Sequence, residues 1–368
     1  MELFFTDKNF SIAGTPFIGV PFFMDANYRL QDEINDFFSK VLIERAKSPQ
    51  TWKSYAYWLL DFFKWASANG VNWKRITRQE IVAYRNWSLE ECNLKPSTVN
   101  GRITVLKHFF DYAERLNIIK NNPINSKKST GFATADSDFL AHTHTIYYQR
   151  NDFTVKENTE LPKFFSDDEL NKIANAIKSE RLTLMIRIML ECGLRRSEVS
   201  KLPDALIQKA IKDAFSLGSD KEVQIKLPAE ICKGGKSRNV FISYSTVMRL
   251  MQYRNLVRPE HVKKYRAKHK KNPKAFWLTQ MGSEFQPTTL SIEVNELGKK
   301  IGIDTNPHKF RHTFATNYYS ITKDLRGLQL LLGHSNIQTT TIYEHTAVDD
   351  RFGYLAEYHR HIDHLIQS

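Results

Sequence analysis

The sequence is poor in cysteine, with three among 368 residues: Cys92, Cys192 and Cys232. None lies in a CxxC pair or beside histidines at metal-ligand spacing, which argues against a disulfide framework or a structural zinc site. No stretch approaches the roughly 18 consecutive apolar residues of a membrane-spanning helix. The N-terminus lacks a basic segment followed by a long apolar one, so it does not resemble a signal peptide. We therefore expect a protein of the reducing cytoplasm.

Acidic residues are in deficit. The chain has 53 Lys and Arg against 40 Asp and Glu, which gives a net charge of +13 and an isoelectric point near 9.4. This excess favours a polyanionic partner, nucleic acid first, although a merely basic cytoplasmic protein is the alternative. The hydrophobic fraction of 41% is ordinary for a globular protein. The length predicts two domains.

The first domain is predicted to be all-α and to occupy residues 45–125. It follows an N-terminal extension, 1–44, whose Gly and Pro residues favour short strands or loop in its first part. Apolar residues then recur three and four positions apart, as in amphipathic helices. Thr77 followed by Glu80 predicts a capping box at the start of one helix. The Trp and Phe stripes at this spacing are expected to form a core.

The second domain is predicted at residues 161–368, after a polar interdomain linker at 126–160. Ser166 followed by Glu169 predicts another capping box. Apolar and polar residues alternate over 223–242 around a Lys-Gly-Gly-Lys turn, which indicates a β-hairpin. Helical patterns resume from there and end in an amphipathic tail helix. The expected fold class is mainly α with a small antiparallel β-sheet.

Tyr343 lies near the C-terminus within TTIYEH. A tyrosine is a weak nucleophile, because with a pKa of about 10 only about one molecule in a thousand is phenolate at neutral pH. Attack on a phosphodiester would need arginines for the phosphate oxygens, a general acid for the leaving oxygen, and histidines as donors or proton acceptors. The second domain holds candidates for each role: Arg195, Arg311, Lys233, His308 and His334.

Each candidate alone has an ordinary structural explanation, such as a helix cap, a turn or a surface pair. Their order along the chain is more specific: GLRRSE at 193–198, CKGGK at 232–236, HKFRH at 308–312, LLGH at 331–334 and TTIYEH at 340–345. With these motifs the chain resembles the tyrosine recombinases, or phage-type integrases. The resemblance covers roughly residues 161–346, with a looser helical likeness over about 45–125.

The resemblance implies an all-α, SAM-like core-DNA-binding domain and an α+β catalytic domain with six catalytic residues. These are Arg195 and Arg311 on the phosphate, Lys233 as general acid, His308 and His334 as donors, and Tyr343 as nucleophile. Glu198 is implied to orient Arg195, and His312 to be structural. Lys236, on the same turn, is the alternative to Lys233.

The implied reaction is site-specific DNA recombination through a 3′-phosphotyrosine, in a phage or other mobile element of bacterial origin. It needs no ATP, metal or other cofactor. The implied partners are double-stranded recombination sites, a second copy on one site and four copies in the synapse, with an accessory directionality protein also compatible. The chain is expected in the cytoplasm at the nucleoid, without a membrane partner.

DNA binding is expected to be mainly to phosphates and therefore salt-sensitive. The candidate DNA-binding side chains are Arg102, Lys107, Lys236 and Arg238. An outward-facing helix charge is the alternative for Arg102 and Lys107. The basic run 262–274 fits phosphate contact and a solvated loop equally well.

Three other functions are compatible with parts of this pattern. A type IB topoisomerase uses the same tyrosine chemistry but relaxes supercoils as a monomer. An inactive relative would bind DNA without cutting it. A metal-dependent nuclease is disfavoured, because the sequence shows no cluster of carboxylates.

Overall fold

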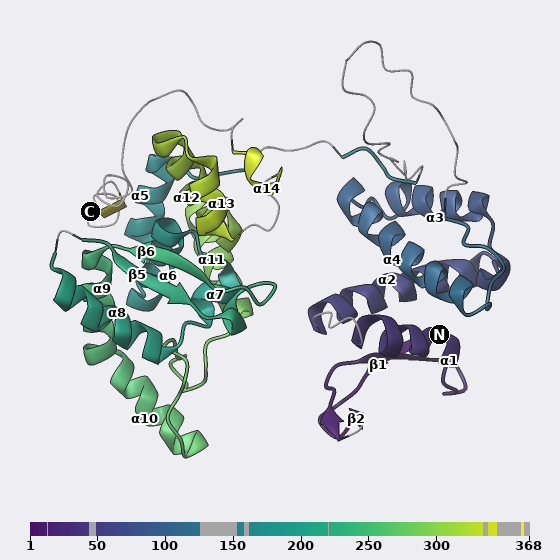
Figure 1. Ribbon diagram of the computed structural model, residues 1–368, viewed down its shortest axis with the longest axis horizontal. Helices are drawn as coiled ribbons and strands as arrows, with labels where there is room; N and C mark the ends of the chain where they lie inside the picture. Colours follow the sequence, from purple (N-terminus) through teal and green to yellow (C-terminus); the bar gives the residue numbers. More distant parts are fainter. Residues whose placement is uncertain are drawn as a thin grey trace, which may run out of the picture. The chain divides into compact units, whose positions relative to one another are not determined.

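The computed structural model describes residues 1–12, 14–43, 49–125, 153–157, 162–219, 221–333, 338–343 and 362–363. The chain divides into two compact units, Met1–Thr159 and Glu160–Ser368 (Figure 1). Both units are mainly helical, with two-stranded antiparallel sheets. None of the helices in the described ranges has the length and apolar character needed to cross a membrane.

The first unit begins with short strands, as predicted for this part of the chain. Strand β1 (Glu2–Phe5) pairs antiparallel with β4 (Pro21–Met24), and β2 (Ser11–Ile12) pairs with β3 (Thr15–Pro16). A short helix α1 (Asp32–Phe37) and a π-helical turn η1 (Phe38–Ile43) follow.

Three longer helices complete the first unit, with a 3-10 turn, η2 (Trp73–Arg75), between the first two. They are α2 (Pro49–Ala68), α3 (Arg78–Glu90) and α4 (Pro96–Arg115). The capping box at Thr77 and Glu80 is confirmed. Phe62 and Phe109 are fully buried and pack edge-on against neighbouring aromatic rings, so the aromatic stripes form the core as expected.

The second unit is a helical domain with one hairpin. Its elements are α5 (Asp167–Ala176), α6 (Glu180–Cys192), α7 (Arg196–Ser200), α8 (Asp204–Leu217), β5 (Val223–Leu227), η3 (Ala229–Ile231), β6 (Arg238–Ile242), α9 (Tyr244–Leu256), α10 (Arg258–His269), α11 (Pro287–Ile301), α12 (Pro307–Thr322), α13 (Leu325–Leu332) and α14 (Gln338–Thr341). Helix α6 is buried along most of its length and packs against α12, α9 and β6. A helix that is apolar nearly all round belongs in the centre of a domain.

The β-hairpin predicted around the Lys-Gly-Gly-Lys turn is confirmed. Strands β5 and β6 pair antiparallel from Val223–Ile242 to Leu227–Arg238. Val223, Ile225 and Leu227 are buried while the residues between them are exposed, which is the alternation expected for a strand with one face on the core. The predicted capping box at Ser166 and Glu169 is also present.

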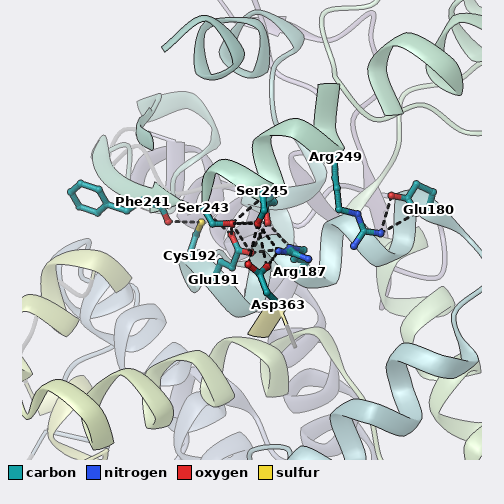
Figure 2. Close-up of polar contacts among 10 residues, drawn as sticks. Glu180, Arg187, Glu191, Cys192, Phe241, Ser243, Ser245, Arg249 and Asp363 are labelled. Atoms are coloured by element: carbon teal, nitrogen blue, oxygen red, sulfur yellow. Dashed lines mark hydrogen bonds and ion pairs between the residues drawn. The ribbon is translucent and has the colours of Figure 1, made fainter. Parts of the chain in front are cut away.

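A buried ionic network ties the C-terminal end of the chain to α6 (Figure 2). Arg187 and Glu191 are one turn apart, have fully buried side chains, and form an ion pair of 2.9 Å. Ser243 donates a hydrogen bond to the Glu191 carboxylate, and Arg187 also pairs with Asp363. Next to Asp363, Ile362 is fully buried. Its side chain lines an apolar pocket together with Leu170, Ile173, Ala174, Ile177, Thr183, Ile186 and Leu190.

Candidate active site

The link between α6 and α7 is shaped by Gly193. This residue caps α6 with a φ of 59°, in the left-handed region that favours glycine. A β-carbon at this position would lie 2.4 Å from the Phe314 ring of α12, so the approach of the two helices also needs a residue without a side chain. Arg195 follows as the N-cap of α7, and Glu198 is the third residue of that helix.

Glu198 holds two arginines. Its carboxylate accepts from Arg195 at the backbone N–H (2.7 Å) and at the guanidinium (3.0 Å), and from both terminal nitrogens of Arg238 (2.8 and 2.6 Å). Burial alone would raise the pKa of Glu198, but the hydrogen bonds and charge of Arg238, then of Arg195, lower it to about 2. Glu198 therefore orients Arg195, and it does so together with a second guanidinium.

Three arginines converge on the end of α13. Its last carbonyls have no partners within the helix, and this end carries the negative pole of the helix dipole. Arg238 donates to Leu331 O (2.8 Å), Arg311 to Leu332 O (2.8 Å), and Arg195 to Gly333 O (3.3 Å). Three guanidinium groups from different parts of the sequence are thus fixed at one helix end.

Arg311 is the most deeply placed of the three. It is 5% exposed and donates from its other terminal nitrogen to Gly193 O at 2.5 Å. Burial, and then the positive charge of Arg195, lower the pKa of Arg311 to about 9. The side chain is therefore still cationic at neutral pH, and a neighbouring anion would relieve the cost of its burial.

Helix α12 carries His308, Arg311 and His312 at spacings of three and four, which place them on one face. The Asn306 side chain caps the helix by accepting from the Lys309 N–H. Desolvation lowers the pKa of the His308 side chain, and so do the positive charges of several nearby groups. These groups are Arg311, Arg196, Arg195 and Lys233.

Tyr343 is buried and contacts His312. Its ring is 1% exposed, and its Oη lies 2.7 Å from Nδ1 of His312. Burial raises the pKa of Tyr343 to about 12, while burial, then His308 and Arg311, lower the pKa of His312 to about 4. His312, expected to be structural, thus contacts the candidate nucleophile. The spacing of four residues between His308 and His312 places both on one face of α12, and this spacing could have indicated from the sequence that His312 belongs to the site.

The two lysines of the hairpin turn are exposed. Lys233 and Lys236 flank Gly234 and Gly235, whose φ angles of 81° and 66° close the turn. Lys233 reaches the site electrostatically, because its charge contributes to lowering the pKa of His308. His334 lies outside the described residues, as do all but residues 153–157 of the proposed linker and most of the predicted tail helix.

Of the adjacent pair Arg195 and Arg196, only the first reaches Glu198 and the end of α13. Arg196 donates instead to the Ser291 hydroxyl of α11 at 2.6 Å. Within the ranges that the structure covers, no three His, Cys, Asp or Glu side chains are grouped so that they could ligate a metal.

Two of the candidate DNA-binding side chains, Arg102 and Arg238, have partners within their own units. Arg102 is 8% exposed and pairs with Asp61 at 2.5 Å, so it is not an outward-facing charge in this structure. Arg238 is engaged by Glu198 and Leu331 within the site. The carboxylate that holds Arg238 is buried, whereas Asp61, the partner of Arg102, is 41% exposed. Lys107 is half-buried, and Lys236 is exposed.

The basic run 262–274 is largely helical, so the solvated loop, one of its two interpretations, does not describe most of it. It forms most of α10 and the residues after it, and α10 projects from the end of the second unit opposite α14 (Figure 1). Residues 257–283 include eight Lys or Arg residues and one carboxylate, that of Glu260 on α10. Lys263, Lys270, Lys271 and Lys274 are exposed.

Residues 163–349, about half of the chain, match the phage integrase family. The chain belongs to the phage integrase family. Residues 34–117 also match the phage integrase N-terminal SAM-like domain. The resemblance drawn from the motifs is confirmed, and with it the assignment of the chain to the tyrosine site-specific recombinases.

The similar proteins agree with this family. The chain is 25% identical over 325 residues to tyrosine recombinase XerC of Actinobacillus succinogenes, covering 86% of this chain and 93% of the relative. It is 26% identical over 322 residues to XerC of Herpetosiphon aurantiacus, covering 87% and 92%.

Solved structures of family members share the fold. XerH site-specific recombinase, in a post-cleavage complex with its difH substrate, matches with a TM-score of 0.60 at 20% identity and covers 86% of each chain. The Tn1549 transposon integrase bound to transposon right-end DNA matches with a TM-score of 0.58 at 16% identity, over 90% of this chain and 99% of that one. The fold class predicted from the sequence, mainly helical with a small antiparallel sheet, is confirmed.

Proposed function

We propose that this integrase-family chain cuts and rejoins double-stranded DNA at specific sites through a 3′-phosphotyrosine on Tyr343. The observation that carries this proposal is the convergence of Arg195 and Arg311 at the end of α13. Two cations of fixed orientation, one of them deeply buried, form a site suited to an anion with two equivalent oxygens, such as a phosphodiester.

Charge stabilisation is the main catalytic contribution that these residues can make. The attacked phosphate gains negative charge on its non-bridging oxygens, and Arg195 and Arg311 neutralise it without having to reorganise. His308, within electrostatic reach of both, donates a further hydrogen bond, and His334 is proposed as a second donor. Removal of one such donor typically costs about 100- to 1,000-fold in rate.

The leaving group is the 5′-oxygen of the next nucleotide. It departs as an alkoxide unless it is protonated, and Lys233 on the exposed hairpin turn is the proposed acid, with Lys236 as the alternative. The bond energy of the broken phosphodiester is kept in the phosphotyrosine. A second 5′-hydroxyl then attacks and reseals the strand, so the proposed reaction consumes no nucleotide cofactor.

The proposed substrate follows from the family and from the charge of the chain. XerH and the Tn1549 integrase are seen bound to difH and transposon-end DNA, respectively. A lambda integrase dimer is seen on a core site. We propose the same class of substrate here, with a dimer on one site and a tetramer in the synapse. An accessory protein that sets direction is compatible with this assembly.

We propose that the chain consists of four segments. They are an N-terminal extension at 1–44, a core-DNA-binding domain at 45–125, a linker at 126–160 and a catalytic domain at 161–368. Lys107, Lys236 and the exposed lysines of α10 are the proposed phosphate contacts. Binding through such contacts weakens steeply with salt.

The decisive experiment traps the covalent intermediate. The protein is incubated with a nicked suicide substrate made from the DNA that flanks its gene, and the adduct is mapped by mass spectrometry. We expect the DNA on Tyr343, no adduct with Tyr343→Phe, and an unchanged yield with Tyr318→Phe, a half-buried tyrosine on α12. An adduct on another residue, or none with any DNA tested, would contradict the proposal. Relaxation of a supercoiled plasmid by the monomer, without strand exchange, would favour a topoisomerase.

A further inference from the structure

His312 contacts the Tyr343 oxygen, which must lose a proton when it attacks the phosphate. The reaction proposed above assigns no role to this histidine. It lies on α12 beside Arg311, and its Nδ1 is 2.7 Å from Tyr343 Oη. The phenol is buried, so water has little access to the proton. A side chain within hydrogen-bond reach of the proton to be moved has the geometry of a general base.

We propose that His312 is the general base that takes the proton of Tyr343 during strand cleavage and returns it during resealing. The inference rests on the proposed function, because it concerns the same nucleophile. It assigns the imidazole the tautomer with its hydrogen on Nε2. In that tautomer the lone pair of Nδ1 accepts the hydrogen bond from the phenol.

The proton and bond changes balance without a further reactant. As Tyr343 Oη bonds to phosphorus, its hydrogen moves to Nδ1 and leaves His312 as an imidazolium. The bond between phosphorus and the 5′-oxygen breaks, and that oxygen takes a proton from Lys233. In resealing, a 5′-hydroxyl gives its proton to the lysine, and His312 returns its own to the departing phenol.

The positive charges near His312 and Tyr343 make the proton transfer between these two side chains depend on a bound phosphate. His308 and Arg311 are the charged groups whose effect lowers the pKa of His312, after burial. The pKa of Arg311 is in turn lowered by the charges of Arg195 and Arg238 and raised by that of Glu198. A phosphate at the two arginines would offset part of this positive field. The basicity of His312 would then rise when the substrate is in place, and the phenol would keep its proton until then.

The experiment uses a DNA substrate whose scissile 5′-oxygen is replaced by sulfur. A thiolate leaves without a proton, so the rate of adduct formation no longer depends on Lys233 and reports on the nucleophile. In His312→Asn the amide can still hold the phenol but cannot take its proton. We expect cleavage at least about 100-fold slower than wild type, the range typical of a general base, with DNA affinity unchanged.

The pH profile separates a base from a structural support. The wild-type rate should change little around neutral pH, because His312 is already deprotonated there. The His312→Asn rate should rise about tenfold per pH unit, because only the small phenolate fraction can then attack. In His312→Ala, added imidazole should restore part of the rate. His261→Asn is the matched control, a half-buried histidine on α10 whose pKa burial also lowers.

Two results would overturn the proposal. One is a His312→Asn protein that cleaves within about threefold of wild type, well short of the effect of a general base. The other is a slow variant whose rate has the wild-type pH dependence and does not respond to imidazole. In either case the wild-type adduct on Tyr343 still forms, so the proposed function survives. Absence of that wild-type adduct would refute the proposed function itself.

Discussion

Replacement of Glu198 by Gln tests how strongly the arginine cluster depends on one buried carboxylate. The pKa of Glu198 falls from 4.5 to about 2 on folding. A difference of about 2.5 pKa units corresponds to about 3 kcal/mol of stability at neutral pH. The side chain is fully buried, so solvent does not screen this contribution. The typical cost of removing one partner from a buried ion pair, about 3–5 kcal/mol, is similar.

The pH dependence of the effect has a defined sign. A carboxylate with a lowered pKa stabilises the folded state above its unfolded pKa, and this stability is lost as the pH falls towards the folded pKa. The difference in unfolding free energy between wild type and Glu198→Gln should therefore be about 3 kcal/mol at pH 7. It should shrink to about half of that value at pH 3.

The measurement can use a probe within the second unit. Trp277 is the one tryptophan beyond residue 160, is fully buried, and donates from its indole to Val199 O, next to Glu198. Urea unfolding followed by fluorescence, corrected with a Trp277→Phe protein, isolates this probe. Glu180→Gln, which breaks the exposed pair with Arg249, is the control and should cost at most about 1 kcal/mol. A Glu198→Gln effect below about 1 kcal/mol, or one independent of pH, would refute the reasoning.

Three further changes probe other parts of the molecule. Gly193→Ala should destabilise the second unit by roughly 2–4 kcal/mol in urea unfolding, because it combines a left-handed backbone with a clash against Phe314; an effect below about 1 kcal/mol would contradict the close approach of α6 and α12. Arg311→Lys should slow adduct formation at least about 100-fold, measured in single-turnover assays, because lysine cannot hold both carbonyls and a phosphate; a near-normal rate would remove Arg311 from the chemistry. Replacement by Gln of four of the exposed lysines on and just after α10 should reduce the slope of log K for DNA against log salt concentration by up to about four, while the same change at Lys209 and Lys212 on α8 should not. A slope equal to that of the wild type would contradict a contact between α10 and DNA. The four residues are Lys263, Lys270, Lys271 and Lys274.

Local features of the fold could be predicted from sequence. Both capping boxes and the hairpin are short-range patterns, in which the residues that interact are three to nineteen positions apart. Side-chain chemistry at such spacing is largely independent of the rest of the fold. The motif residues Arg195 and Arg311 could also be named in advance, because arginine is suited to phosphate.

The long-range contacts could not be predicted. Arg238 looked like one more cation on a basic hairpin, yet it supports Glu198, 40 residues away. Arg102 looked exposed on an amphipathic helix, but Asp61, on another helix, neutralises it within the unit. The partner of His312 is 31 residues away and lies in the turn after α14. Each of these roles depends on how helices pack, which periodicity alone does not specify.

The burial of Ile362 and the ion pair of Asp363 with Arg187 affect how the protein can be handled. A version of the chain shortened before residue 362 would leave Arg187 with one carboxylate fewer and would open the apolar pocket that Ile362 helps to line. An affinity tag at this end should therefore be fused after Ser368, so that its removal by a protease leaves Ile362 and Asp363 in place. Ile362, close to the last position of the sequence, is thus part of the interior of the second unit.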